Sequence, residues 1–501
     1  MMAAPLFEAL LRRTTKTAFQ WLYRCIVGVL TIVIATANCH SVNATELAQS
    51  GSLRTINIAP GSSGSYPGVS GGVALGNKFI FDANDSVHGY EPWVTDGTQA
   101  GTLLLADIRP GLRGSREWSL GPYFLFGGMA YFLVFKDTVV DSGHQLWRTD
   151  GTPAGTMRAA WIFTDVDAFA GLMVAGKYLY WFGTSENFTW LYRSDGTQDG
   201  TKPVYAFATN DCAQESASIG DTLFFIAKSL TDKSGCELWK SNGTQSGTKM
   251  VKDIYRGDSD PVLLAPRGSY LYFSLLNKAE VWRTNGTAAG TKRIASICRK
   301  KSDCSVTSIW PLGSTVLFAG DDGIHGNELW RTSGTSGGAQ MVKNVRKGTD
   351  EFVAYESFAT SVGNVIGNRL YFWADDGIHG MEPWVSDGTS RGTRLVADIN
   401  SGSSDSGGYW EDSPYITGTP FISSYNGIFF GADAGSGMRL HYLKGSVLSQ
   451  VVSDLPMVKP PKRRGSSQIN TIGLRRTGSA LYVSFCSSSA GCELGVLSES
   501  P

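Results

Sequence analysis

The sequence predicts an all-β fold, a β-propeller built from four-stranded blades, on three observations. Glycine occurs 60 times in 501 residues and aromatic residues make up 11% of the chain, a composition typical of many turns between short aromatic strands. A motif anchored by Trp or Tyr recurs at intervals of 43 to 54 residues, close to the length of one propeller blade. The last repeat also ends before its fourth strand, while a strand-like segment stands apart near the N-terminus.

Each repeat contains four β-like pieces bounded by Gly, Asn and Asp. In the clearest copy the first piece approaches a turn at 362–368, and the others are Leu370–Trp373, Glu382–Val385 and Thr393–Ile399. These pieces are short and rich in aromatic or β-branched residues, as antiparallel strands are. Four such strands per repeat make one blade. The anchors are Trp93, Trp147, Tyr192, Trp239, Trp282, Trp330 and Trp384.

Two degenerate repeats follow the anchored ones, which gives nine blades; the alternative is eight, if one weak repeat is not a separate blade. The segment Leu53–Gly61 resembles Arg394–Gly402 of the seventh repeat. We expect Leu53–Ala59 to pair with Glu493–Leu497 as the missing strand, because a closed ring leaves no exposed sheet edge. The propeller then occupies residues 53–501.

The N-terminus is typical of a signal peptide covering residues 1–37, followed by a linker at 38–52. Four basic residues precede the apolar run Cys25–Ala37, which is short for a bilayer span and ends in a small-x-small cleavage pattern. The alternative is an uncleaved signal anchor that starts near Phe19. Both interpretations predict a secreted or cell-surface protein. No later segment of the sequence is typical of a transmembrane helix.

The charge balance argues against nucleic acid as a partner. Lys and Arg number 44, as do Asp and Glu, so the formal net charge is zero, whereas phosphate binding needs a clustered positive excess. We expect an extracellular protein or glycan as the partner, with membrane contact only through an uncleaved leader.

The cysteines and sequons predict the same compartment. Six cysteines form three pairs that are close in sequence, which predicts local disulfides; the alternative is free buried thiols. The pairs are Cys212 with Cys236, Cys298 with Cys304, and Cys486 with Cys492. Asn-x-Ser/Thr sequons predict N-glycosylation at Asn84, Asn187, Asn242 and Asn285.

Two recurring motifs have a structural interpretation. Asp-Gly-Thr, as at Asp96–Thr98, lies between the third and fourth strands, and Asp-Gly or Asn-Gly supplies the conformations that hairpin turns need. In Glu-Leu-Trp the Glu and Trp share one face of a strand. We expect the Trp to pack between blades, with a row of sugar-binding rings as the alternative. The Glu is expected to accept hydrogen bonds from turn amides or from a neighbouring cation, such as Arg148, Lys240, Arg283 or Arg331.

The sequence DDGIHG occurs at Asp321–Gly326 and Asp375–Gly380, with a relative around His88. It lies between the second and third strands, where a tight turn is needed. Three histidines on separate blades cannot ligate one zinc ion, and one turn supplies too few oxygens for calcium, which needs about six to eight. The turn interpretation is therefore favoured. Calcium remains the alternative, and it is the one cofactor considered, with candidate ligands Asp321, Asp322, Asp375 and Asp376.

Two function classes remain. The sequence contains no H-E-x-x-H, G-x-S-x-G, Walker or dinucleotide motif, so no catalytic residues are assigned and a non-enzymatic role is favoured. The first hypothesis is a binding or adhesion scaffold that uses the face carrying the DDGIHG turns and the long linkers between blades. The second is a hydrolase or lyase with its site at the central channel. Candidate binding residues on the linkers are Arg113, Arg116, Trp118, Tyr409 and Trp410.

The combined pattern, Glu-Leu-Trp followed after two residues by Asp-Gly-Thr and then Gly-Thr, resembles the repeat of the ELW-DGT family, found mainly in bacterial secreted or surface proteins. The resemblance covers nearly all of the chain after the leader, and the blades are more loosely similar to kelch-type blades. It implies a propeller and little about chemistry. This sequence departs from the family pattern by its local cysteine pairs, by Asn242 and Asn285 in place of the turn Asp, and by losing the motif in the last two repeats.

Overall fold

The computed structural model describes the propeller and none of the first 52 residues, so the predicted signal peptide and linker lie outside the described part. All described strands belong to one compact unit, Ser52–Glu499. No helix of the described residues is long and apolar enough to cross a membrane. The described residues are 53–59, 64–115, 122–138, 141–162, 165–166, 172–185, 188–208, 212, 215–231, 233–276, 278–299, 304–334, 338–346, 363–407, 421–435, 438–451, 473–478, 480–487 and 491–498.

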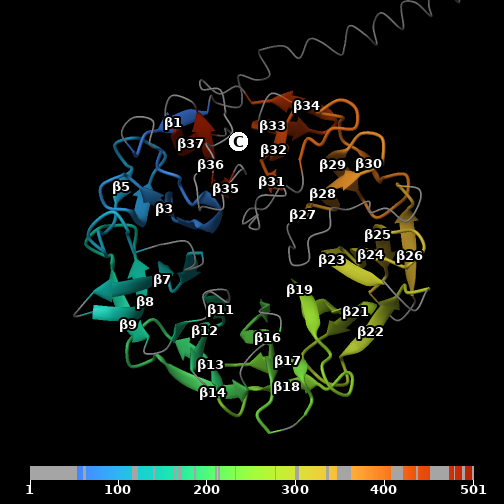
Figure 1. Cartoon of the computed structure of the whole chain (residues 1–501), viewed down its shortest axis with the longest axis horizontal. Coiled ribbons are helices and arrows are strands. Elements are labelled where there is room, and N and C mark those ends of the chain that lie inside the picture. The colour runs from blue at the N-terminus through green and yellow to red at the C-terminus, as the bar shows by residue number, and fades with distance from the viewer. Residues whose placement is uncertain are drawn as a thin grey trace, which may run out of the picture. The chain divides into compact units, whose positions relative to one another are not determined.

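Nine antiparallel sheets form nine blades of a ring, as predicted (Figure 1). Blade 1 contains β2 (Val73–Leu75), β3 (Lys78–Asn84), β4 (Tyr90–Thr95) and β5 (Leu103–Leu104), preceded by the 3-10 turn η2 (Val69–Gly71). Blade 2 contains β6 (Phe124–Phe126), β7 (Met129–Thr138), β8 (Asp141–Thr149) and β9 (Met157–Ile162). Blade 3 contains β10 (Asp165–Val166), β11 (Met173–Ala175), β12 (Tyr178–Ser185), β13 (Phe188–Ser194) and β14 (Lys202–Ala208).

Blade 4 contains β15 (Ser216–Ile219), β16 (Thr222–Lys228), β17 (Cys236–Ser241) and β18 (Lys249–Lys252). Blade 5 contains β19 (Pro261–Arg267), β20 (Tyr270–Leu275), β21 (Lys278–Thr284) and β22 (Lys292–Ser296). Blade 6 contains β23 (Ser305–Leu312), β24 (Thr315–Asp321), β25 (Asn327–Thr332) and β26 (Ala339–Lys343). Blade 7 contains β27 (Gly363–Ile366), β28 (Arg369–Asp375), β29 (Met381–Ser386) and β30 (Arg394–Leu395).

Blade 8 contains β31 (Phe421–Ser423), β32 (Ile428–Asp433), β33 (Met438–Lys444) and β34 (Val447–Gln450). Blade 9 contains β35 (Gly473–Thr477), β36 (Ala480–Ser487), β37 (Gly491–Ser498) and β1 (Arg54–Ile56). In every blade the first strand lies nearest the centre of the ring and the fourth at its rim (Figure 1). In blade 3 the first strand is divided, since β10 and β11 both pair with β12.

The N-terminal strand closes the ring, which confirms the predicted pairing. Strand β1 is antiparallel to β37, with Arg54 opposite Val496 and Ile56 opposite Leu494. Leu53 and Ile56 are buried, and Phe79 of blade 1 stacks on Tyr482 of blade 9 with ring centroids 4.5 Å apart. The first and last blades are therefore joined by a sheet ladder and by a continuous core.

The hydrophobic core lies between the blades. Each cluster of buried side chains draws residues from neighbouring blades. Trp239 of blade 4, for example, packs edge-on against Phe207 of blade 3, with centroids 5.1 Å apart. The Trp anchors are buried at positions 93, 239, 282, 330 and 384. These rings pack between blades as expected, so they do not form an exposed sugar-binding row.

One predicted strand is shorter than expected. The fourth strand of blade 7 is only Arg394–Leu395, because Pro383 in the neighbouring strand has no N–H to extend the ladder. The Val396 amide instead donates to the Pro383 carbonyl at 2.8 Å. Blade 1 also has a proline at this position and a two-residue outer strand. Residues 363–366 of blade 7, expected within a turn, form the inner strand β27.

Candidate functional site

The Asp-Gly-Thr turn of blade 1 is held by its own side chains. Asp96 Oδ1 accepts the Thr98 amide at 2.8 Å and the Thr98 hydroxyl at 2.7 Å. Thr95 Oγ1 accepts the Gly97 amide at 2.9 Å and meets the Thr102 hydroxyl at 2.7 Å. Gly97 has φ of 91°, where a side chain would be strained. Because the polar groups of the motif are used within the turn, its geometry supports the structural interpretation.

Basic side chains fasten these turns to the preceding blade. Lys78 Nζ donates to the Gly151 carbonyl at 2.7 Å, and Lys240 Nζ to the Gly286 carbonyl at 2.6 Å. Arg331 reaches the Gly388 carbonyl at 3.1 Å. Lys240 and Arg331 had been expected as alternative partners of the recurring glutamates. They bond the next blade's turn instead, because that turn presents its carbonyl directly beside them.

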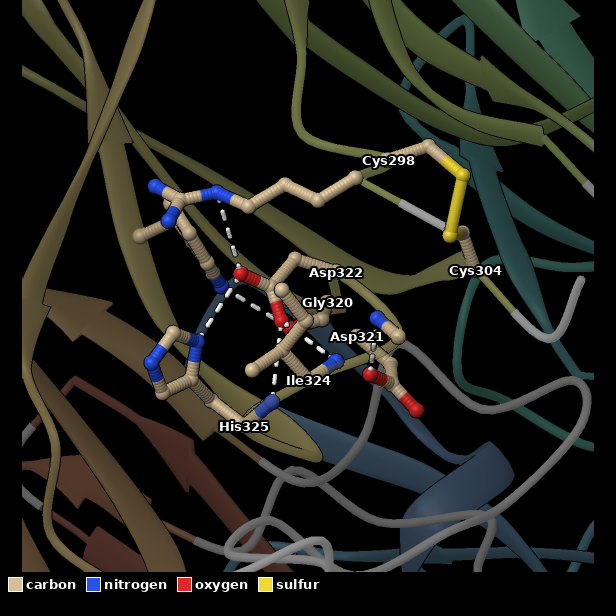
Figure 2. Close-up of polar contacts among 10 residues, drawn as sticks. Cys298, Cys304, Gly320, Asp321, Asp322, Ile324 and His325 are labelled. Atoms are coloured by element: carbon tan, nitrogen blue, oxygen red, sulfur yellow. Dashed lines mark hydrogen bonds and ion pairs between the residues drawn. A yellow bond between two sulfur atoms is a disulfide. The ribbon is translucent and has the colours of Figure 1, made fainter. Parts of the chain in front are cut away.

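The DDGIHG turn of blade 6 forms a compact hydrogen-bonded unit (Figure 2). Asp321 Oδ1 accepts the Gly323 amide at 2.7 Å, and Asp322 Oδ1 accepts the amides of Ile324 and His325, both at 2.9 Å. His325 Nδ1 lies 2.9 Å from Asp322 Oδ2. Asp322 is fully buried, and Arg299 Nε lies 3.4 Å from its Oδ2. Both carboxylates therefore already have partners within the protein.

The other two copies have the same design. His379 Nδ1 lies 2.8 Å from Asp376 Oδ2, and His88 Nδ1 lies 2.6 Å from Asp85 Oδ2. These hydrogen bonds raise the pKa of both histidines above its ordinary value. Burial acts to raise the pKa of Asp376, but the bonds from His379 and the turn amides hold it below its ordinary value. These Asp–His contacts hold each histidine ring against its own turn.

The calcium candidates are used in these same contacts. Asp375 Oδ1 accepts the Gly377 amide at 2.7 Å, and its Oδ2 pairs with Arg346. Asp321, Asp322 and Asp376 likewise accept turn amides. A calcium ion at either turn would have to displace these donors, so the donor set fits calcium poorly. The turn interpretation accounts for all four residues.

The recurring glutamates of the third strand fasten the linkers between blades. In blade 7, Glu382 accepts the amides of Ile399 and Asn400 at 3.0 and 3.1 Å, and the Ser406 hydroxyl at 2.6 Å. Glu382 is fully buried. The partners lie 17 to 24 residues further along the chain, in the linker to blade 8. This contact confirms the expected bonds from amides, although the amides belong to the linker.

The same contact recurs in four more blades, and we call the five residues the linker glutamates: Glu91, Glu237, Glu328, Glu382 and Glu493. In blade 9 the amides come from Ile58 and Ala59 at the other end of the chain, at 3.1 and 3.3 Å. Burial raises the pKa of Glu91 and Glu328 to about 7 and that of Glu237 to about 8.

The glutamates place the linkers and the DDGIHG turns on one face of the ring, as predicted. The Ser406 amide donates to the Met381 carbonyl at 3.0 Å, just after the turn of blade 7. The Ser115 amide donates to the Tyr90 carbonyl at 3.1 Å, just after the corresponding turn of blade 1. A Cβ built on Gly89 would lie 2.4 Å from the Gly114 nitrogen, so linker and turn are in close contact. We call this surface the linker face.

Of the predicted binding residues, only Arg113 is described, and it is exposed on the linker of blade 1. Arg116, Trp118, Tyr409 and Trp410 lie outside the described residues. The structure adds an apolar residue that the sequence analysis did not single out. It stands before the histidine in each DDGIHG-type turn: Val87 is 60% exposed, Ile324 40% and Ile378 67%. The sequence contained one signal for this residue, namely that an apolar side chain recurs at the same position of an otherwise polar turn.

Two of the predicted disulfides are present, Cys212–Cys236 and Cys298–Cys304. Cys492 is also disulfide-bonded, and Cys486 is its register partner in the β36–β37 ladder. These bonds indicate an oxidising compartment. Cys236, Asp258 and Asp260 lie close enough to suggest a metal site. The disulfide removes the thiolate, and Asp258 accepts the Cys236 amide at 2.8 Å, so this group does not fit one.

The carboxyl groups with raised pKa are distributed among the blades. Each linker glutamate bonds its own linker, and none of the five lies on an innermost strand. Glu215 directly precedes the inner strand β15, and burial raises its pKa. Its Oε2 accepts the Leu264 amide of β19 at 2.8 Å, which joins blades 4 and 5. These described groups act as backbone acceptors.

Of the predicted glycosylation sites, Asn242 and Asn285 are exposed in the third-to-fourth-strand turns, and Asn84 is half-buried at the end of β3. Asn187 lies outside the described residues. Asn84 Oδ1 accepts the Ser86 amide at 2.8 Å.

Comparisons with known proteins found only distant structural likenesses. No family model matches the sequence, and no curated protein matches it. Among solved structures, a puromycin hydrolase is 11% identical over 87% of this chain and 61% of its own, with a TM-score of 0.40. A puromycin-hydrolyzing peptidase of Mycobacterium tuberculosis is 10% identical over the same shares, with a TM-score of 0.39. The chain spans about three fifths of the length of these structures. Likeness at this level carries no argument about activity.

Proposed function

We propose that this protein is a secreted or cell-surface propeller that acts as a binding or adhesion scaffold for an extracellular protein or glycan, and that the linker face carries the binding site. The resemblance of its repeats to the ELW-DGT family fits this role. The observation that carries the proposal is the exposed apolar residue in each DDGIHG-type turn, held outward by a rigid turn.

The energetics of the turn favour a binding role for these residues. The Asp322–His325 contact and the two amide bonds to Asp322 fix the backbone around Ile324 without any help from its side chain. An isoleucine exposed at a turn does not stabilise the fold through burial. A rigid apolar tip loses little entropy when it enters a partner's surface, which favours association. Arg113 on the neighbouring linker of blade 1 adds a charged, exposed side chain to the same face.

The distribution of titratable groups supports binding over catalysis. A hydrolase or lyase at the central channel needs acid and base groups that converge on one point. In the described part of the chain, the carboxyl groups with raised pKa are separated on different blades and bonded to backbone amides.

The test is a comparison of matched surface variants. The full chain is screened against arrays of extracellular proteins and glycans, and the affinity of any ligand found is then measured by surface plasmon resonance. We expect the double variant Ile324→Ser/Ile378→Ser to weaken binding about tenfold or more, since each buried apolar anchor contributes about 1–2 kcal/mol.

Leu125→Ser is the control, because Leu125 is 46% exposed beside the β6–β7 turn, on the opposite face. Binding that survives the double variant and is lost on changing the opposite face would reject the linker face. Turnover of an arrayed glycan or peptide would instead favour the hydrolase or lyase.

A further inference from the structure

Two neighbouring blades carry Asn where the other complete turns of this type carry Asp. In blade 4, Asn242 Oδ1 accepts the Thr244 amide at 3.1 Å and the Thr244 hydroxyl at 2.7 Å. In blade 5, Asn285 Oδ1 accepts the Thr287 amide at 3.1 Å and the Thr287 hydroxyl at 2.7 Å. Asp96 and Asp387 make the same pair of contacts in blades 1 and 7.

The rest of each turn is also unchanged. The Gly243 amide donates to Ser241 Oγ at 3.0 Å, as the Gly388 amide does to Ser386 Oγ. Because one side-chain oxygen makes all the contacts, Asn and Asp give the turn the same geometry. The exchange therefore has no structural consequence within the turn. What it adds is a side-chain amide two residues before a threonine, which is the acceptor sequence for N-linked glycans.

The surroundings leave room for a glycan. Asn242 and Thr244 are exposed, and so are Asn285 and Thr287. The turn tips beyond them, at 245–246 and 288–289, are exposed as well. The threonine hydroxyl already contacts the asparagine side chain, so the two groups of the acceptor sequence are held together at the surface. The disulfide Cys212–Cys236 in blade 4 indicates that the chain folds in an oxidising compartment, and the endoplasmic reticulum, where such glycans are added, is one of these.

We infer that Asn242 and Asn285 are N-glycosylated and that these glycans project from the face opposite the linker face. Strands alternate in direction, so the turn between strands three and four lies at the other end of the blade from the turn between strands two and three. Two glycans on adjacent blades cover the part of this face over blades 4 and 5 with hydrated carbohydrate. The inference does not depend on the binding role proposed above.

The experiment uses the full chain secreted from a eukaryotic cell line. Trypsin cuts after Lys240, Lys249, Arg283 and Lys292, so each site lies alone in one short peptide, 241–249 or 284–292. These peptides are analysed as intact glycopeptides by mass spectrometry. Intact analysis is needed because Asn-Gly deamidates spontaneously to the same Asp that glycan release leaves. We expect both peptides to be mostly glycosylated.

The chain supplies its own matched variants. Asn242→Asp and Asn285→Asp reproduce the turns of blades 1 and 7, so each should remove one glycan while the variant is still secreted as a folded protein. Asp387→Asn creates the same acceptor sequence before Thr389 in blade 7, and it should add one glycan at position 387. Unmodified peptides 241–249 and 284–292 in the secreted wild-type protein would overturn the inference, as would failure of Asp387→Asn to gain a glycan.

Discussion

Blades 5 and 7 carry a glutamate at the same position of the third strand, yet the two side chains make different contacts. In blade 7, Glu382 turns to the linker and accepts two of its amides. In blade 5, Glu280 accepts the Tyr255 hydroxyl at 3.1 Å and the Trp282 indole N–H at 3.0 Å, and it pairs with Arg293. The motif is the same, so the neighbours decide the outcome.

The deciding neighbour lies opposite the tryptophan in the outer strand. Trp384 of blade 7 faces Leu395, which offers no donor, whereas Trp282 of blade 5 faces Arg293. A charged donor competes with backbone amides, because a charge-assisted bond is about twice as strong as a neutral one. Glu280 is thereby taken from its linker, and that linker is closed by the disulfide Cys298–Cys304 instead. In the part of this linker that the structure describes, the covalent bond therefore takes the place of the amide bonds to the glutamate.

In blade 3 a disulfide likewise occurs in a linker that has no glutamate acceptor. Trp190 occupies the position of the glutamate, since it follows Thr189 and precedes Leu191 and Tyr192 in β13. The linker after blade 3 contains Cys212, which is bonded to Cys236 of blade 4. In blades 3 and 5 a linker without a glutamate acceptor is thus tied by a disulfide, whereas blades 2 and 8, which carry Gln145 and Arg439 at this position, have no cysteine in their linkers.

The largest expected effect comes from deleting residues 1–60. This removes the strand that completes blade 9 and the two amides that Glu493 accepts. We expect a loss of about 4 kcal/mol or more of the free energy of unfolding, since buried apolar residues and a buried acceptor lose their partners together. Urea unfolding followed by tryptophan fluorescence measures it. Deletion of residues 1–50, which keeps β1, is the control, and equal stability of the two proteins would contradict ring closure by this strand.

A smaller difference should separate the two glutamates. Glu382→Ala leaves two linker amides and the Ser406 hydroxyl without their acceptor, and we expect it to cost about 2–4 kcal/mol. Glu280→Ala should cost about 1 kcal/mol, because its partners Arg293 and Tyr255 are exposed enough to be solvated. Calorimetry of the two variants compares them directly. A larger loss of stability for Glu280→Ala than for Glu382→Ala would show that the side-chain contacts of Glu280 stabilise the fold more than the linker contacts of Glu382.

The disulfide of blade 5 should contribute about 2 kcal/mol, the value expected for closing so short a loop. Cys298→Ser/Cys304→Ser removes it without introducing a charge. The Arg299 amide and side chain should then lose their fixed position on Asp322, so hydrogen exchange at the amides of 297–299 is expected to rise. Unchanged exchange would mean that the linker is held without the disulfide. The matched control is Cys212→Ser/Cys236→Ser, which should leave exchange at 297–299 unaltered.

The smallest effect is a dependence on pH. The pKa of Glu237 in the fold, about 8, lies above its ordinary value of 4.5, so the fold favours the protonated form. That contribution to stability is fully present below the ordinary pKa and is lost as pH rises through 8. Between about pH 7 and about pH 9 we expect the wild type to lose about 1–2 kcal/mol through this residue.

Glu237→Gln keeps an acceptor for the Ile254 amide and removes the titration. Its stability should therefore vary less over the same range than that of the wild type. Equal pH dependence of the two proteins would assign the effect to other groups. Glu280→Gln is the control substitution in a blade whose glutamate is paired with Arg293.

Much of the fold was predictable because it depends on short-range patterns. The spacing of Trp93, Trp239 and Trp384 predicted blades, and Asp-Gly predicted turns whose contacts lie within seven residues. The length of β30 was predicted wrongly, since the limit set by Pro383 acts across the ladder. At the candidate site, the turn interpretation of Asp322 and Asp376 needed only local geometry. The exposed tip at Ile378 required knowledge of which side of the turn faces solvent.

By itself the sequence predicted a ring of nine blades, with eight as the alternative, its closure by the segment around Ile56, and the pairing of near-sequence cysteines, because strand periodicity, turn residues and cysteine spacing act over short distances. Only the tertiary structure decided which glutamates fasten linkers. Glu382 and Glu280 stand in equivalent sequence contexts, and the choice depends on donors that the fold brings from another strand or from the preceding linker. A buried carboxyl group accepts the donors that folding places within hydrogen-bond distance of it.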